Sequence, residues 1–284
     1  FDIYGNSSQN GKYKNGGNEG FANFTRANNC NWYSGNFVNN KLDGEFKLFR
    51  SNGALLELKS LKDNKLNGPW LEYSESGTLT GKSNYTDGKF NGEYKVFYDN
   101  GTLFSESNNV EGKADGAFKK YHLNGKLKVK GQFDTGNRTG KWKTYYYNGS
   151  LRSEYEYNNK GNLEGWLIKY DIKGDTTSKV PYSNGLLNGI DFDYGFNNKP
   201  LWEHHYKKGK LKKYVSYDST GVVLSSGKKE YVLNDSYGFK YISATLKKGK
   251  FNGVHSTYWK NGNLKKTITY ENGILNGEVN EFFE

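Results

Sequence analysis

The chain has 284 residues, of which 34% are hydrophobic and 17% aromatic, and it contains 36 glycines but only 3 prolines. The low hydrophobic share excludes an ordinary large core, and the high aromatic share, typical of strands, excludes a disordered chain. The net charge of +11 permits an anionic partner, whereas the single cysteine, Cys30, excludes an intrachain disulfide and a thiolate metal cluster.

Residues 1–19 precede the repeats that fill the rest of the chain, and we expect them to form a polar cap or arm. The sequence begins at Phe1 and contains no methionine. We interpret this start as the result of removing an upstream segment, and we favour a signal peptide. Export to the periplasm or cell surface is therefore expected in preference to the cytoplasm. No apolar run reaches 18 residues, so no transmembrane segment is predicted.

From residue 20 onward, glycine recurs at a nearly fixed spacing of 24 residues. These anchor glycines are Gly20, Gly44, Gly68, Gly92, Gly116, Gly140, Gly165, Gly189, Gly253 and Gly277. The spacing is 25 between Gly140 and Gly165, and 64 between Gly189 and Gly253. We expect the long gap to hold two decayed copies, anchored near Lys212 and Ser236. The sequence thus predicts about twelve units over residues 20–284, with the decayed repeats at about 205–250.

Fixed positions after each anchor carry the same kinds of side chain. A bulky residue lies two positions on, a glycine nine positions on, and usually a leucine eleven positions on. A ring lies five positions on, in a series that includes Tyr73, Phe97, Tyr121, Tyr145 and Tyr170. Asn-Gly pairs recur at turn positions, where both residues need a positive φ. The sequence therefore predicts an all-β, elongated, single-sheet array of hairpins, because only stacked hairpins can bury their rings.

The pattern Gly-x-(Trp/Phe/Tyr)-x-x-(Tyr/Phe)-x-x-x-Gly-x-Leu resembles the MORN repeat, in particular the bacterial variant of proteins labelled antitoxin components. The clearest copies are residues 68–73, 92–97 and 140–145, and the resemblance covers about residues 20–284. It implies a hairpin repeat array that builds scaffolds, adaptors, lipid-associated proteins or antitoxins. The chain departs from the pattern at Lys212 and Ser236, and it has Asp191 and His255 at usually apolar positions. Residues 190–255 are therefore expected to contain a bend, a bulge or a partner site.

Residues with catalytic or metal-binding chemistry are few. His122, His204, His205 and His255 are the only bases that titrate near neutral pH. His204 and His205 are neighbours on an expected strand and point to opposite faces, so we predict sheet-surface histidines and no metal site. No glycine-rich loop has phosphate-binding spacing. We expect no catalytic residue, cofactor or small-molecule substrate. Nucleic acid is not the expected partner, because the rings are already assigned to stacking between units.

The leading hypothesis is a non-catalytic scaffold that binds another protein, within a bacterial envelope or secretion-related assembly. Two alternatives stay open: an antitoxin or immunity protein that neutralises a toxin, and a peripheral binder of anionic membranes through the +11 charge. We place the partner site in the decayed stretch, at Trp202, His204, His205 and Tyr206, because tryptophan is enriched at interface hot spots. In the competing interpretation, Trp202 fills the narrow core beside a packed bend.

Overall fold

The computed structural model describes residues 9–25, 32–195, 198–235 and 238–284. Cys30 and Ser236 lie outside these ranges. The regular elements of the described residues are strands, and none of these residues forms a helix long and apolar enough to cross a membrane. The chain divides into two compact units: unit 1 comprises residues 1–138 and 147–149, and unit 2 comprises residues 139–146 and 150–284.

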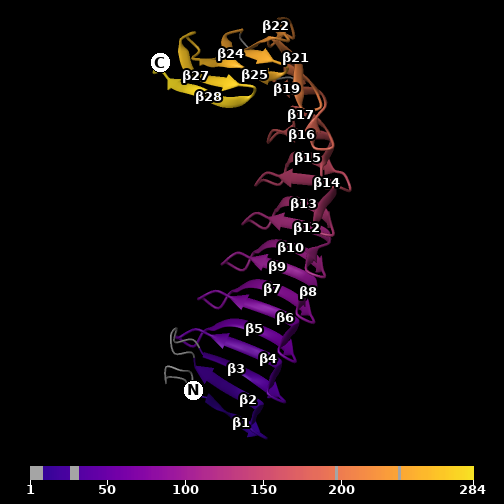
Figure 1. The fold of residues 1–284 in the computed structure, drawn as a ribbon, viewed down its shortest axis with the longest axis vertical. Helices are drawn as coiled ribbons and strands as arrows, with labels where there is room; N and C mark the ends of the chain where they lie inside the picture. The colour runs from indigo at the N-terminus through magenta and orange to yellow at the C-terminus, as the bar shows by residue number, and fades with distance from the viewer. Residues whose placement is uncertain (1–8, 26–31, 196–197, 236–237) are drawn as a thin grey trace. The chain divides into compact units, whose positions relative to one another are not determined.

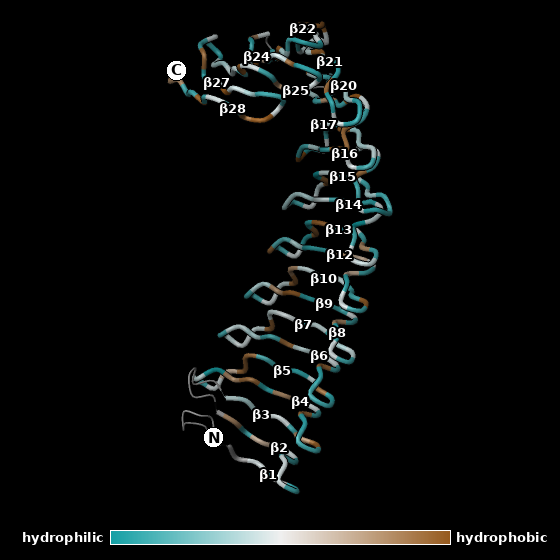
Figure 2. Tube along the Cα trace, viewed as in Figure 1, coloured by the Kyte–Doolittle hydropathy of each residue, from teal (hydrophilic) through white to brown (hydrophobic). Residues whose placement is uncertain are grey.

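Unit 1 is an antiparallel sheet of hairpins whose strands follow one another as successive rungs (Figure 1). Figure 2 shows that its turns are largely hydrophilic, so the apolar side chains gather in the strands. The strands are β1 (Gln9–Lys14), β2 (Gly17–Thr25), β3 (Trp32–Val38), β4 (Lys41–Phe49), β5 (Leu55–Lys62), β6 (Lys65–Tyr73), β7 (Leu79–Thr86), β8 (Lys89–Phe90), β9 (Gly92–Phe97), β10 (Leu103–Val110), β11 (Lys113–Ala114), β12 (Gly116–Tyr121) and β13 (Leu127–Asp134).

Unit 2 contains strands of two antiparallel sheets, and β14 (Asn137–Tyr145) includes the boundary with unit 1. The first sheet continues with β15 (Leu151–Tyr157), β16 (Leu163–Tyr170), β17 (Thr176–Ser183), β18 (Leu186–Leu187), β19 (Gly189–Tyr194), β20 (Pro200–Lys207), β21 (Lys210–Tyr217) and β22 (Val223–Gly227). The second sheet contains β23 (Glu230–Asn234), β24 (Lys240–Lys247), β25 (Lys250–Phe251), β26 (Gly253–Tyr258), β27 (Leu264–Glu271) and β28 (Ile274–Glu281).

Several hairpins are closed at one end by a two-residue turn in which both φ angles are positive. Asp63 and Asn64 have φ of 51° and 66°, and Asp87 and Gly88 have φ of 50° and 81°. These are the angles of a type I′ turn, whose twist matches that of the paired strands. Glycine, asparagine and aspartate tolerate this region best. The turns therefore explain why these residue types often occur four and five positions before an anchor.

The anchor glycines themselves lie within strands or at a strand start. Gly68 has φ of 113° inside β6, and the register of β5 with β6 shifts between Lys59 and Leu61. A Cβ on Gly68 would lie 2.9 Å from the Ser60 Cβ. This local irregularity is a β-bulge, in which residues 67–69 of β6 lie opposite the single residue Ser60 of β5. The Asn-Gly pair at residues 67–68 thus marks a bulge, whereas the sequence pattern alone suggested a hairpin turn.

The repeated rings end their strands and face the repeated leucines across the hairpin. Tyr73 pairs with Leu79, and Phe97 pairs with Leu103. Tyr121 and Tyr145 likewise face leucines, and Tyr170 faces Thr176. Ring contacts join neighbouring strands, as in the stacked pair Trp32 and Phe49, whose centroids lie 3.8 Å apart. These cross-strand contacts give each repeat position a packing role.

The all-β array of hairpins predicted from the spacing is confirmed. The predicted single sheet is interrupted in unit 2, because the strands after β22 form a second sheet. The change of sheet lies within residues 190–255, where the sequence predicted an irregularity. In the expected N-terminal cap, residues 9–14 form β1 and pair with β2. The role of residues 1–19 as a cap stays a proposal.

Candidate functional site

A cluster of buried side chains lies in unit 2, where strands of the first sheet meet strands of the second. We call it the joint cluster. Its members are Leu211, Tyr214, Tyr231, Leu233, Ala244 and Leu246, with Trp202, Tyr206, Val232, Ile242 and Phe251 packed against it. These residues come from β20 and β21 of the first sheet and from β23, β24 and β25 of the second. The stretch that lost its anchor glycines has therefore gained a compact core of its own.

Two backbone contacts lie beside this cluster, one within the second sheet and one between the two sheets. The Leu246 amide donates a hydrogen bond to the Lys229 carbonyl at 2.6 Å. Gly249, in the turn between β24 and β25, has φ of +75°, and a Cβ there would lie 2.2 Å from the Leu211 carbonyl oxygen. The turn thus approaches the β21 backbone so closely that only glycine fits.

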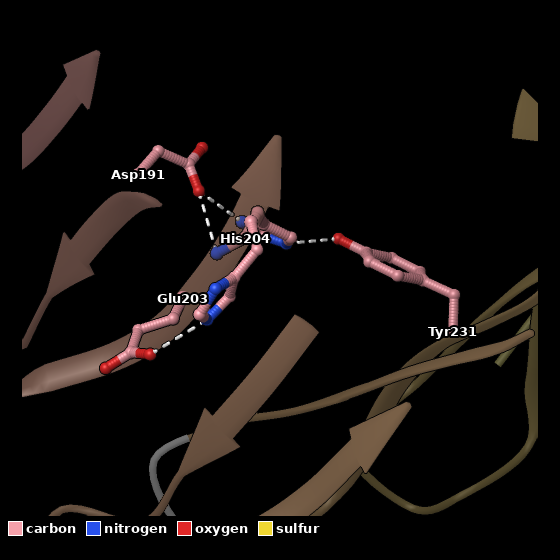
Figure 3. Close-up of polar contacts among 5 residues, drawn as sticks. Asp191, Glu203, His204 and Tyr231 are labelled. Atoms are coloured by element: carbon pink, nitrogen blue, oxygen red, sulfur yellow. Dashed lines mark hydrogen bonds and ion pairs between the residues drawn. The ribbon is translucent and has the colours of Figure 1, made fainter. Parts of the chain in front are cut away.

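A buried chain of polar groups crosses the same joint (Figure 3). His204 on β20 lies between Asp191 on β19 and Tyr231 on β23. Its Nδ1 lies 2.9 Å from Asp191 Oδ1, and its Nε2 lies 2.6 Å from Tyr231 Oη. Asp191 Oδ1 also accepts a hydrogen bond from the His204 backbone amide at 2.9 Å. The imidazole is only 7% exposed, and both of its nitrogens have partners.

Burial sets the protonation of the groups around this histidine. Desolvation raises the pKa of Tyr231 far above its ordinary value, and it raises the pKa of Tyr206 to about 12. Desolvation, followed by the charge of Asp191, also raises the pKa of Asp193. Tyr231 therefore keeps its proton, and its neutral hydroxyl is hydrogen-bonded to His204 Nε2. This arrangement favours a structural hydrogen-bond chain, since the phenol is held in its un-ionised form.

The four residues predicted to contact a partner lie on both faces of β20. Trp202 packs against the joint cluster and donates its Nε1–H to the Asn234 carbonyl at 3.1 Å. Tyr206 packs against the same cluster, and His204 is buried beside it. His205 lies on the opposite face, with its Nε2 3.3 Å from a carboxylate oxygen of Glu203. The strand alternation predicted for the two histidines is thus observed. The surface position predicted for His204 is wrong, because Asp191 and Tyr231 satisfy the imidazole inside the joint.

The sequence contained a signal for Asp191 but none for Tyr231. Asp191 was noticed as a polar residue at a normally bulky position, which indicates a buried polar contact. Tyr231 lies beyond the repeat phase that the anchors define, so nothing marked it as a partner of His204. His255, the other departure, is half-buried beside the rings of Phe251 and Tyr270, and burial lowers its pKa.

Each unit contains a tyrosine–glutamate hydrogen bond between neighbouring hairpins. Tyr121 Oη donates to Glu106 at 2.7 Å in unit 1, and Tyr170 Oη donates to Glu154 at 2.7 Å in unit 2. These bonds lower the pKa of both carboxyls. Burial and the bonded carboxylate raise the pKa of each of the two phenols to about 12. The ring position predicted as a packing position therefore also makes a polar contact.

These shifts predict a stability plateau with two limits. The lowered carboxyl pKa values stabilise the fold above the ordinary value of about 4.3, and this contribution is lost as pH falls through the lowered values. The raised phenol pKa values stabilise the fold below about pH 10, and this contribution is lost as pH rises through about 12. Thermal melting followed by circular dichroism should show both limits. In a Tyr121→Phe/Tyr170→Phe variant, the loss of stability at both pH limits should be smaller. An unchanged pH profile would contradict the role given to these two hydrogen bonds.

A metal centre finds no support in the described ranges, where no group of three or more histidine, cysteine or acidic residues is placed to hold an ion. The prediction that the chain binds no metal or cofactor is left as an expectation.

Comparison with known families identifies the repeat. A family model described as "MORN repeat variant" matches five segments: residues 66–87, 90–108, 114–135, 138–159 and 251–272. The chain carries MORN repeats. The first four matches cover consecutive hairpins, and the fifth MORN match lies beyond the decayed stretch. The resemblance to the MORN repeat is thereby confirmed in these five segments, and the antitoxin-type variant stays a hypothesis. MORN-repeat proteins are generally non-enzymatic.

Other comparisons add little to the MORN assignment. No curated protein matches the chain. A structure titled "Crystal Structure of TcdB2-TccC3-Cdc42" is 10% identical, with a TM-score of 0.20, and the match covers 92% of this chain and 16% of that one. A Tc holotoxin pore from Photorhabdus luminescens is 10% identical, with a TM-score of 0.18 and coverage of 88% and 17%. The chain thus spans less than a fifth of each matched chain, and these scores support no argument about function.

Proposed function

We propose that this chain is a non-catalytic scaffold that binds another protein, within a bacterial envelope or secretion-related assembly. Three features support the proposal. The chain carries repeats of a family that is generally non-enzymatic. Hairpins stacked at a fixed spacing offer a large surface built from short, neighbour-stabilised units. The ionisable groups of the joint are engaged with one another, which suits a structural role.

The observation that carries the proposal is the way in which successive loops of unit 1 are tied together. Arg50 Nη2 donates to the Tyr73 carbonyl at 2.9 Å, and Tyr98 Oη donates to the Tyr121 carbonyl at 3.0 Å. Asn124 Nδ2 donates to the Tyr147 carbonyl at 2.9 Å. Each bond links a loop to the residue 23 positions later, one repeat on. These bonds tie neighbouring loops to one another, and such preorganisation reduces the entropy lost when a partner binds.

The test is capture followed by reconstitution. The full chain is immobilised and exposed to an extract of cells that make it, with a basic protein of equal net charge as the control bait. A protein retained only by the chain is then purified, and the mass of the complex is measured in solution. We expect a complex of fixed stoichiometry. Failure of every retained protein to form such a complex would contradict the scaffold proposal.

The captured protein also separates the scaffold from an antitoxin or immunity protein. If the partner arrests growth when it is produced alone, and co-production of this chain restores growth, the immunity role replaces the scaffold role. If the partner is a non-toxic envelope or secretion component, the scaffold role holds. Deleting the gene for this chain should then disperse that component without killing the cell.

Peripheral membrane binding makes a different prediction. If the +11 charge alone drives association with vesicles that contain phosphatidylserine, binding should disappear as ionic strength rises past physiological values, where the Debye length is about 8 Å. Co-sedimentation across a salt series measures this. Neutral phosphatidylcholine vesicles are the control. Tight binding to the anionic vesicles at high salt would favour the membrane role.

A further inference from the structure

Most of the net positive charge lies in one stretch of unit 2. Residues 199–250 contain twelve lysines and no arginine, against four acidic residues. The chain as a whole has a formal charge of +11. This stretch also supplies the joint cluster, so the positive charge is concentrated where the two sheets meet.

Five of these lysines line a single groove beside the joint cluster. The groove has a volume of ≈ 460 Å³, and its lining contains no acidic residue. The lysines are Lys212, Lys228, Lys229, Lys247 and Lys248. Leu211 and Leu246 also line the groove, and both are buried members of the joint cluster. The site therefore combines an apolar floor with a rim of ammonium groups.

Two backbone contacts beside the joint, one between the sheets and one within the second sheet, bring lysines from separate segments together. The close approach of Gly249 to Leu211 brings Lys248 beside Lys212. The hydrogen bond from Leu246 to the Lys229 carbonyl brings Lys247 beside the segment between β22 and β23. These contacts use main-chain atoms and a glycine, so the groove is fixed by the fold while the long lysine side chains can adapt.

The groove lysines differ from many lysines of the regular hairpins in their partners. Lysines of the array pair with carboxylates, as in Lys82–Glu93 at 3.1 Å and Lys143–Glu154 at 3.0 Å. Among the described residues, none of the five groove lysines forms an ion pair. Glu230 is adjacent to Lys229 in the sequence but does not line the groove. Five like charges without carboxylates repel one another, and an anionic ligand would relieve that repulsion.

We propose that this lysine groove binds an extended acidic segment of the partner protein. The inference rests on the proposed scaffold function and names the chemistry of the partner. Alternate side chains of an extended segment point the same way, about 6 to 7 Å apart, so successive carboxylates can reach successive ammonium groups. The apolar floor suits the methylene groups of glutamate or an interspersed apolar residue.

Other anions fit the groove less well. A membrane surface is flat and would leave the recessed apolar floor unused. Single-stranded nucleic acid is held by bases stacked on aromatic side chains, and no aromatic residue lines this groove. Lysine, a flexible point charge, also lacks the bidentate geometry with which arginine recognises phosphate. An acidic peptide therefore accounts for more of the observed lining than the other two.

The experiment measures fluorescence anisotropy of a labelled decaglutamate peptide with the full chain. The test variant is Lys212→Gln/Lys229→Gln/Lys248→Gln. The matched control is Lys62→Gln/Lys65→Gln/Lys128→Gln, which removes the same charge from exposed, unpaired lysines of unit 1. We expect the groove variant to raise Kd about tenfold or more, since each exposed charge pair contributes a few-fold, and the control to change it about twofold or less. Circular dichroism and unfolding by urea show whether each variant remains folded.

Three results would overturn the proposal. Equal losses in the two variants would mean that net charge alone attracts the peptide. No loss in the groove variant would mean that the groove is not the site. Selective loss of binding to phosphatidylserine vesicles or to oligothymidylate, with peptide binding unchanged, would replace the acidic segment by that ligand. The synthetic peptide experiment needs no natural partner. Its failure would contradict the acidic-segment proposal only, and the capture experiment would still test the scaffold proposal.

Discussion

Replacing Gly249 by alanine is expected to destabilise unit 2 by about 2 to 4 kcal/mol. Two costs combine at this position. A φ of +75° is unfavourable for a residue with a Cβ, and that Cβ would lie 2.2 Å from the Leu211 carbonyl oxygen and 3.0 Å from its amide nitrogen. Both contacts are with main-chain atoms, so relief requires the two sheets to move apart. Unfolding by urea, followed by tryptophan fluorescence, measures the loss.

Gly209 provides a matched control in the preceding hairpin. It occupies the equivalent turn position, with φ of +73°, but the nearest atom to an added Cβ is a methyl carbon of Leu186 at 3.7 Å. Gly209→Ala should therefore cost only the backbone term, about 1 to 2 kcal/mol. Equal destabilisation by the two substitutions would show that the turn after β24 is not pressed against β21. That result would contradict the close contact between Gly249 and Leu211.

Replacing Tyr231 by alanine is expected to cost about 3 to 5 kcal/mol, the range for truncating a large buried ring. Tyr231 is 7% exposed, and its ring contacts His204, Tyr214 and Phe251. The substitution removes packing from both sheets together with the hydrogen bond to His204. Urea unfolding again gives the change in free energy. Loss of native near-ultraviolet circular dichroism would report that the joint has loosened.

Two companion variants separate the contributions at Tyr231. Tyr231→Phe keeps the ring but leaves His204 Nε2 without its partner, and we expect a loss of about 1 to 3 kcal/mol. Tyr241→Ala truncates a tyrosine of β24 that is 47% exposed, and it should cost about 1 kcal/mol or less. A Tyr231→Phe variant as stable as the wild type would contradict the structural role assigned to the buried polar chain.

The repeat positions were predictable from the sequence because each performs one local task in every copy. Tyr73 and Leu79 face each other across a hairpin, as their fixed spacing implied. The spacing identified the anchor glycines correctly, but it did not identify their structural role. An Asn-Gly pair is equally suited to a turn and to a bulge. Only the register of the paired strands distinguishes the two. At Gly68 it shows three residues of β6, 67–69, opposite one residue of β5.

The position of the joint could be predicted from the sequence, but the contacts within it could not. The missing anchor at Lys212 and the misplaced polar residue Asp191 marked the stretch as irregular. The partner of His204 is Tyr231, 27 residues away and on the other sheet, and no periodic pattern relates the two. The lysine groove was equally hidden, because its side chains converge only after Gly249 meets Leu211. Contacts outside the repeat need the folded chain to bring them together.

The central claim is that this MORN-repeat chain acts by holding another protein and not by converting it. The most direct measurement is calorimetric titration of the purified captured protein into the full chain, followed by mass analysis of that protein. The account predicts saturation at a fixed stoichiometry and an unaltered partner. A partner that is cleaved or modified on contact, or a titration without saturation, would contradict it.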